Sequence, residues 1–162
     1  MSRYSLAALL CSLTFAGVAN AAVLKESNIS TADAQKLATA TVAACQAKGY
    51  NVSAAVVDRA GLLKAFARAD NAGPHTIEAS QAKAFTSASA KSPTLAIMEN
   101  AQKNQVAANL TDIPGFLLLG GGVPVKAGDA VIGAIGVAGA PGGHLDAQCA
   151  DEVLAANAEL FK

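Results

Sequence analysis

The chain lacks tryptophan, and aromatic residues make up only 4% of its 162 residues. Charged residues are also scarce, at 15%, and 12 basic side chains balance 12 acidic ones. This balance argues against a nucleic-acid partner, because phosphates would require clustered Lys and Arg. A hydrophobic content of 52% argues against disorder. The composition therefore predicts one domain whose core of small and aliphatic side chains lets its elements approach closely.

Several motifs of enzymes and cofactor sites are also absent. The sequence has no phosphate loop, no zinc spacing, no C-x-x-C-H haem attachment and no recognisable nucleophile setting. Gly133, Gly136 and Gly139 are spaced by three, but they lie within a predicted strand, where glycine is typical of close approach by a helix or another subunit. These features argue against nucleotide binding, and any haem would be held non-covalently.

The first 21 residues have the pattern of a bacterial secretory signal peptide. Arg3 supplies one positive charge, residues 5–18 form a short apolar run, and Ala19-Asn20-Ala21 gives the small–x–small cleavage pattern. The run is too short to span about 30 Å of hydrocarbon comfortably as a helix. A buried N-terminal helix is the alternative to a signal peptide. We expect a periplasmic or secreted protein, not an integral membrane protein, with a single domain over residues 22–162.

Export leaves two cysteines, Cys45 and Cys149, in a compartment that permits disulfides. Each lies on the apolar face of a predicted helix. They form a disulfide if these helices are neighbours, or remain buried thiols that act as small hydrophobic side chains. The sequence leaves both possibilities open.

The pattern of the remaining chain predicts the order helix, two strands, two helices, three strands, helix. Ser30 and Asp33 mark the start of the first helix, and Pro74 suits the first turn of the second. Short polar turns between strands are typical of antiparallel hairpins. The fold class is therefore α/β (α+β), with a single five-stranded, mostly antiparallel sheet flanked by helices. The predicted helices cover about 30–48, 75–89, 93–105 and 145–160, and the predicted strands 50–57, 62–69, 116–119, 123–125 and 130–138.

The two histidines are the candidate ligands for haem iron or another metal. His75 lies in a predicted first helical turn, where the helix dipole favours the neutral ring that ligates iron. His144 lies in a predicted Gly-rich loop, which would lose entropy on ordering before it could ligate. A solvated loop or helix-end position is the simpler interpretation of either histidine. The charged residues expected near His75 are Arg68, Glu78 and Lys83.

Two blocks of the sequence resemble the GlcG/HbpS family, which includes the C-terminal domain of PduO-type proteins. The first block is Val56-Val-Asp58-x-x-Gly61-x-Leu63-x-x-Phe66-x-Arg68-x-Asp70-x-Ala72, followed by Glu78-x-x-x-x-Lys83-Ala84. The second and more specific block is Gly121-Gly-Val-Pro124, Gly128, Val131-Ile-Gly-Ala-Ile-Gly-Val137, Gly139-Ala-Pro-Gly-Gly143 and Asp146-x-x-Cys149-Ala150. The resemblance covers residue 30 to the C-terminus and implies an antiparallel sheet with flanking helices in a homo-oligomer. Ala69 departs from the family, which often has Met at that position.

The resemblance implies haem as the ligand, because some members bind haem and exported members are tied to haem capture, degradation or iron handling with a sensor partner. We therefore expect an exported haem-binding protein, with iron ligated by His75 or, in second place, by His144. A propionate would meet Arg68 or Lys83. We expect binding rather than catalysis, with haem degradation as a further possibility and no catalytic residue assigned. The chain could instead be an enzyme or accessory protein acting on a small, glycolate-like hydroxy-carboxylate, or an oligomer-forming structural domain.

Overall fold

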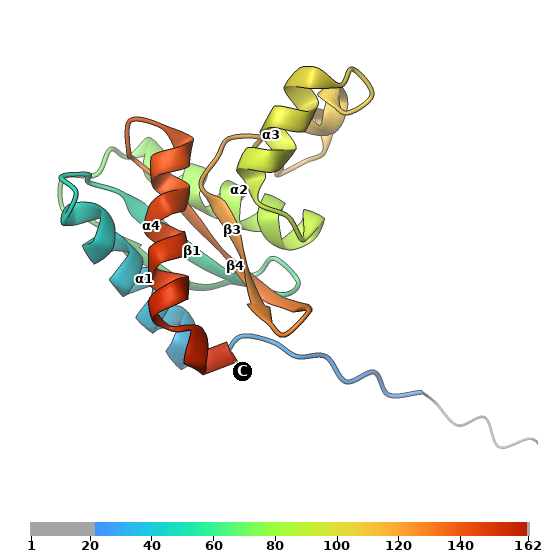
Figure 1. Cartoon of the computed structure of the whole chain (residues 1–162), viewed down its shortest axis with the longest axis horizontal. Coiled ribbons are helices and arrows are strands. Elements are labelled where there is room, and N and C mark those ends of the chain that lie inside the picture. The colour runs from blue at the N-terminus through green and yellow to red at the C-terminus, as the bar shows by residue number, and fades with distance from the viewer. Residues whose placement is uncertain (1–21, 162) are drawn as a thin grey trace, which may run out of the picture.

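Helices and antiparallel strands follow one another along the chain in the order shown in Figure 1. The computed structural model describes residues 22–161, so the predicted signal peptide at residues 1–21 lies outside the described residues. Two short 3-10 helices, Ala108–Asp112 and Ala158–Phe161, complete the described elements. The main elements are α1 (Thr31–Gln46), β1 (Ser53–Asp58), β2 (Leu63–Arg68), α2 (His75–Ala90), α3 (Thr94–Lys103), β3 (Gly122–Ala127), β4 (Ala130–Ala138) and α4 (Gly143–Ala156).

The described strands form one four-stranded sheet in the order β2-β1-β4-β3, with every neighbouring pair antiparallel. The predicted class is confirmed, but the predicted fifth strand at residues 116–119 is wrong. The Leu117 N–H donates to Thr86 Oγ1 at 2.8 Å, and Thr94 Oγ1 donates to the Leu119 carbonyl oxygen at 2.7 Å. Helix side chains therefore bind the backbone of this segment, and it runs as an irregular link.

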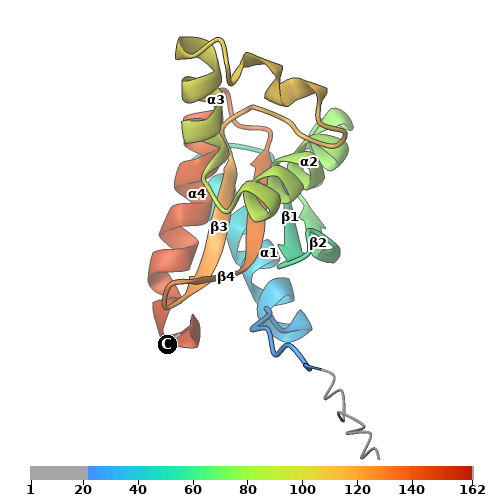
Figure 2. The ribbon, with the colours of Figure 1, turned by 90° about the vertical axis from the view of Figure 1, so that its right-hand side faces the viewer.

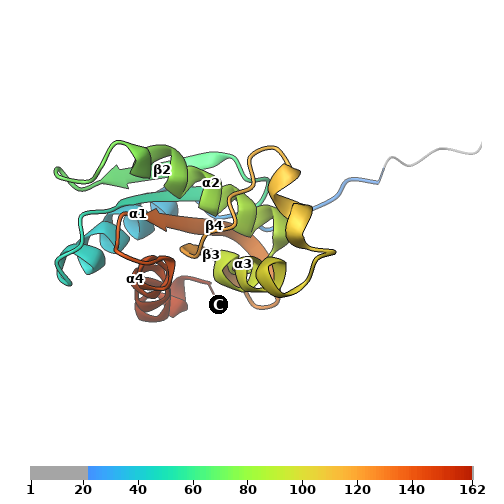
Figure 3. The same ribbon diagram turned by 90° about the horizontal axis from the view of Figure 1, so that it is seen from above.

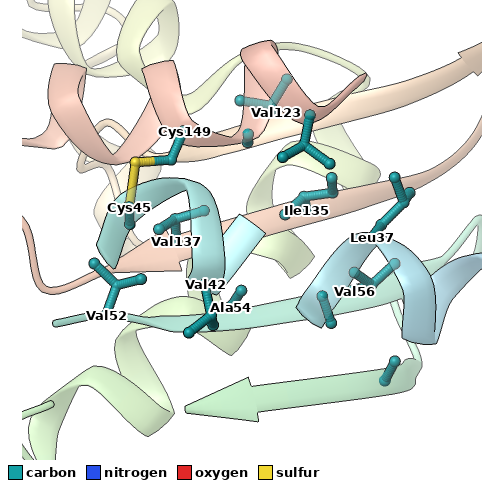
Figure 4. Close-up of a cluster of buried hydrophobic side chains, with 14 of the residues drawn as sticks. Leu37, Val42, Cys45, Val52, Ala54, Val56, Val123, Ile135, Val137 and Cys149 are labelled. Atoms are coloured by element: carbon teal, nitrogen blue, oxygen red, sulfur yellow. A yellow bond between two sulfur atoms is a disulfide. The ribbon is translucent and has the colours of Figure 1, made fainter. Parts of the chain in front are cut away.

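Helices cover both faces of the sheet (Figures 2 and 3). On one face, α1 and α4 pack on the larger core cluster, in which Leu37 and Val42 meet Val56 and Ile135 (Figure 4). On the other face, α2 packs on a smaller cluster of alanines and Val57. The layers are therefore helices, sheet and helix. No helix within residues 22–161 is both long and apolar enough to cross a membrane.

The start of α1 confirms the predicted cap. Ser30 Oγ accepts the N–H of Asp33 at 3.0 Å and donates to the Asp33 carboxylate at 2.6 Å. This pairing satisfies one of the backbone donors that the first helical turn leaves without an intrahelical acceptor.

A glycine within β4 lets α2 lie directly on the sheet. A Cβ at Gly136 would collide with the Ser80 carbonyl oxygen and the Ala84 nitrogen of α2. The sequence interpretation of glycines in this strand as sites of close approach by a helix is therefore confirmed at Gly136.

A disulfide joins Cys45 of α1 to Cys149 of α4, and Figure 4 shows it beside the larger core cluster. The two Cα atoms are 5.4 Å apart, and the cysteines are separated by 104 residues. Both cysteines are fully buried. Of the two possibilities that the sequence left open, the structure has the disulfide.

We predict that the Cys45→Ala/Cys149→Ala variant lowers the free energy of unfolding by about 4–5 kcal/mol, because the unfolded chain regains the entropy that a loop of this size removes. Urea unfolding of the oxidised protein and of the variant measures this difference. A reductant should lower the midpoint of the oxidised protein and leave that of the variant unchanged. Equal midpoints for the oxidised protein and the variant would contradict the prediction.

Candidate functional site

Both histidines line one pocket of about 330 Å³, where α2 and α4 begin. We call it the two-histidine pocket. It is lined by His75, Ala79 and Lys83 of α2, Leu95 and Met98 of α3, Leu119, Gly120, the segment 138–144, and Asp146 of α4.

His75 is the exposed first residue of α2. The next residue, the buried Thr76, fixes the start of this helix, because its N–H and its hydroxyl both donate to the Gly73 carbonyl oxygen, at 3.0 and 2.6 Å. The Thr76 hydroxyl also lies 2.7 Å from Ser53 Oγ of β1 in a buried hydrogen bond. The hydrogen bond to β1 thus fixes the start of α2, and with it the position of the His75 side chain, relative to the sheet.

His144 lies in the first turn of α4, so its predicted placement in a Gly-rich loop is wrong. The helix begins earlier than predicted because the Gly142 carbonyl oxygen accepts the N–H groups of Leu145 and Asp146, at 2.9 and 3.1 Å. The His144 ring packs over Gly142, where a Cβ would lie 2.8 Å from the ring, and His75 packs over Gly73 in the same way, at 2.7 Å. Each histidine therefore follows a glycine by two residues at the start of a helix.

A buried ion pair joins α2 to α4 at the wall of the two-histidine pocket. Lys83 Nζ lies 2.8 Å from Asp146 Oδ2, and the two side chains are only 5% and 3% exposed. Lys83 Nζ also donates to the Val137 carbonyl oxygen at 2.9 Å, and Asp146 Oδ1 accepts the Ala140 N–H at 2.9 Å. The pair thus ties α2, the end of β4 and the following Gly-rich segment to the start of α4.

Burial raises the pKa of the Asp146 carboxyl above its ordinary value. The loss of water around the charge outweighs the attraction of Lys83, the hydrogen bonds from Lys83 and the Ala140 N–H, and the nearby His144. The folded protein therefore holds this proton more tightly than the unfolded chain. The contribution of Asp146 to stability falls as the pH rises from its ordinary pKa through the raised one.

Asp146 is not among the site residues that the sequence predicts. Two signals could have found it: an acidic residue in the first turn of the helix that follows the Gly-rich segment, and a lysine on the Ala- and Ser-rich buried face of α2. A lysine on such a face needs a buried anionic partner, because an unpaired charge there would be too costly.

The remaining predicted site residues lie outside the two-histidine pocket. Arg68 is exposed, and its guanidinium donates to the Ala72 carbonyl oxygen just before α2. Glu78 is exposed and lines a neighbouring pocket of about 370 Å³. The structure therefore brings together His75, His144 and Lys83, and leaves Arg68 at the turn before α2.

The neighbouring pocket shares His75 and Ala79 with the two-histidine pocket. Its other lining residues are Glu78, Ala82, Gly115, Phe116 and Leu117. We call the two pockets together the α2 groove, since they adjoin over the first turns of α2. Within residues 22–161, no group of three or more His, Cys, Asp or Glu side chains could hold a metal ion.

A comparison with known families matches residues 29–155 to the family described as "Haem degrading protein HbpS-like". The chain belongs to this HbpS-like family. The matched range contains both histidines, the Lys83–Asp146 pair and the disulfide. The resemblance to the GlcG/HbpS family is therefore confirmed, whereas the roles of individual residues stay predictions.

Three relatives of this HbpS-like chain show how far the similarity extends. GlcG of Escherichia coli strain K12 is 36% identical over 107 residues, which span 64% of this chain and 78% of GlcG. The crystal structure of a double mutant of Streptomyces reticuli HbpS is 39% identical, with a TM-score of 0.78 over 88% of this chain and 97% of that chain. A crystal structure of a PduOC:heme complex, 23% identical, shares the fold with a TM-score of 0.71 over 80% of this chain and 94% of that chain.

We predict that Lys83→Met and Asp146→Asn each lower the free energy of unfolding by about 3–5 kcal/mol, because each leaves a buried partner unpaired. The double variant should lose much less than the sum, since both charges are then removed. Urea unfolding of the four proteins measures the coupling between the two residues.

The Asn side chain in this double variant keeps an oxygen that can accept the Ala140 N–H. Purely additive losses in the two single variants would show that the ion pair does not couple α2 to α4.

Proposed function

We propose that this protein binds haem non-covalently in the α2 groove, with His75 as the iron ligand. The observation that carries the proposal is the position of His75, which lines both pockets of the groove. Membership of a family described as haem-degrading supports haem as the ligand, and the PduOC complex shows that a protein of this fold holds haem. Haem would supply a redox-active iron whose reactivity depends on its axial ligand.

The side chains of the α2 groove suit such a ligand. Leu95, Met98 and Leu119 provide apolar contacts in the first pocket, and Phe116 and Leu117 in the second. Each pocket alone is near the lower end of the range of about 300–1,000 Å³ for small-molecule sites. A macrocycle therefore needs both pockets, and only a non-covalent mode is open because the sequence has no C-x-x-C-H attachment motif.

The shared position of His75 favours it over His144 as the proposed iron ligand. Iron lies at the centre of a porphyrin, so its ligand belongs near the middle of the groove. His75 lies between the pockets, whereas His144 lines only the first of them. Since His144 lies in an ordered helix, the distinction rests on position rather than on loop entropy.

The first pocket also suits a carboxylate, such as a haem propionate. Lys83 donates two hydrogen bonds within the protein, and its ammonium has a third donor. The start of α4 has no side-chain cap, and free N–H groups at a helix start favour an anion. We therefore assign the propionate to Lys83 and the start of α4 rather than to Arg68.

We also propose that the protein is exported and self-associates. The buried disulfide supports export, because such bonds persist in oxidising compartments. The edge strand β2 exposes Leu63 and Phe66, and the preceding turn exposes Leu62, which supports association between copies of the chain.

A second candidate function is the binding or conversion of a small hydroxy-carboxylate. The same carboxylate-binding features, Lys83 and the uncapped start of α4, favour it. It differs from haem binding in requiring only the two-histidine pocket and not the whole groove.

We predict that haemin gives a saturable Soret shift with the wild-type protein. His75→Ala should weaken this binding at least about tenfold, equivalent to about 1.4 kcal/mol, and move the Soret band, because the iron loses its axial ligand. His144→Ala is the matched control and should leave the position of the band unchanged. The measurement is absorbance titration of the three proteins at equal concentration.

The reverse ranking of the two variants would show that His144 is the ligand. Thermal unfolding with haemin and with glycolate separates the two candidate functions, since a bound ligand raises the unfolding temperature. Stabilisation by glycolate but not by haemin would overturn the haem proposal and support the second function.

A further inference from the structure

A basic pocket lies at the opposite end of α2 from His75. It has a volume of about 280 Å³ and is lined by Arg59, Lys91, Lys126, Asp129, Ala130 and Val131. Three cations and one carboxylate therefore meet in one concavity of a chain whose formal net charge is zero. The lining of this pocket therefore has more cations than carboxylates.

The topology brings these residues together from three separate segments. Asp58 at the end of β1 pairs with Gly133 near the start of β4, so the β1–β2 turn with Arg59 and the β3–β4 turn lie at the same end of the sheet. Lys91 directly follows α2, whose last turns pack on this end of the sheet through Ala88. The cations are thus held by the fold rather than by one flexible loop.

Two of the three cations have no carboxylate partner within the part of the chain that the structure describes. Arg59 forms an exposed ion pair with Glu26 at 3.3 Å. The ion pairs described for residues 22–161 include neither Lys91 nor Lys126. Their mutual repulsion would be relieved by an anion in the pocket.

The backbone of Lys91 gives an independent reason to assign its side chain a role. Its φ of 53° and ψ of 33° lie in the left-handed region, and among the described residues it is the one non-glycine residue with positive φ. Glycine adopts this helix-ending conformation without strain, whereas a residue with a Cβ does not. The helix dipole does not account for a strained Lys91. A cation within the last turn of α2 would interact equally well with the dipole without strain, and that turn has none. Strain retained at such a position indicates a function for the side chain.

We propose that this basic pocket binds a compact, multiply charged oxyanion, either inorganic phosphate or a small polycarboxylate. The Arg59 guanidinium suits bidentate contact with two oxygens of such an anion, and the two lysines provide point charges. The small volume favours an ion of this size. The site is separate from the α2 groove and does not depend on haem binding.

The test is a titration of the ¹⁵N-labelled protein with inorganic phosphate at constant ionic strength, followed by amide NMR. We expect saturable shifts at Lys91, Lys126 and neighbouring amides. Lys91→Gly should weaken phosphate binding at least about tenfold, the loss of one hydrogen bond to a charged group. The same variant should unfold at a higher temperature than the wild type in phosphate-free buffer, because glycine relieves the strained backbone.

Three further variants keep the experiment decisive. Lys103→Gln removes the same charge from α3, outside the basic pocket, and should leave the phosphate affinity unchanged. Lys126→Gln should weaken phosphate binding as Lys91→Gly does, and it tests the basic pocket by itself if Lys91→Gly fails to fold. His75→Ala should leave the phosphate shifts intact, so failure of the haem proposal and of this proposal can be told apart.

A parallel titration with malonate distinguishes a carboxylate source from a phosphate source. Saturable shifts at the basic pocket with either anion support the site. Shifts that grow without saturation for both anions, shifts confined to the α2 groove, or an unchanged affinity in both Lys91→Gly and Lys126→Gln would overturn it.

Discussion

The ion pair between Lys83 and Asp146 is the interaction on which the candidate site depends. Removing two charges from water costs several kcal/mol per ion. At Asp146 this cost exceeds what the attraction of Lys83 and the hydrogen bonds return. Here the Val137 carbonyl oxygen and the Ala140 N–H complete the pair. The ions therefore fix α2 and α4, which carry the two histidines, against each other and against the end of β4.

Small residues in the sheet allow this pair to form. A Cβ at Gly122 would collide with the Lys83 carbonyl oxygen, and one at Gly121 would lie 3.0 Å from Lys83 Nζ and 2.9 Å from the Asp146 Cβ. Together with Gly136 under Ser80, these positions let α2 lie close enough for Lys83 to reach across the sheet. The close packing that the Ala- and Gly-rich composition predicts is thus what brings a lysine and an aspartate 63 residues apart into contact.

Local patterns in the sequence predicted those parts of the structure that local interactions decide. The cap at Ser30, the helix start at Pro74 and the long strand of β4 follow from neighbouring residues. Residues 116–119 were predicted as a strand because a short apolar run does not reveal its hydrogen-bond partners, which are hydroxyls of α2 and α3. His75 and Lys83 were chosen from the sequence, but their meeting with His144 and Asp146 depends on the tertiary fold.

The dipole of α2 explains why the two proposed sites at its ends need different numbers of cations. The start of the helix carries partial positive charge, so a carboxylate in the α2 groove gains from the backbone itself. Lys83 adds a hydrogen-bond donor there, while Asp146 balances its charge. The end of the helix carries partial negative charge, which repels an anion near Lys91. An oxyanion can be held there only if side chains outweigh that repulsion. The three cations outnumber the carboxylates of Asp129 and of Glu26, which pairs with Arg59, and so supply that excess.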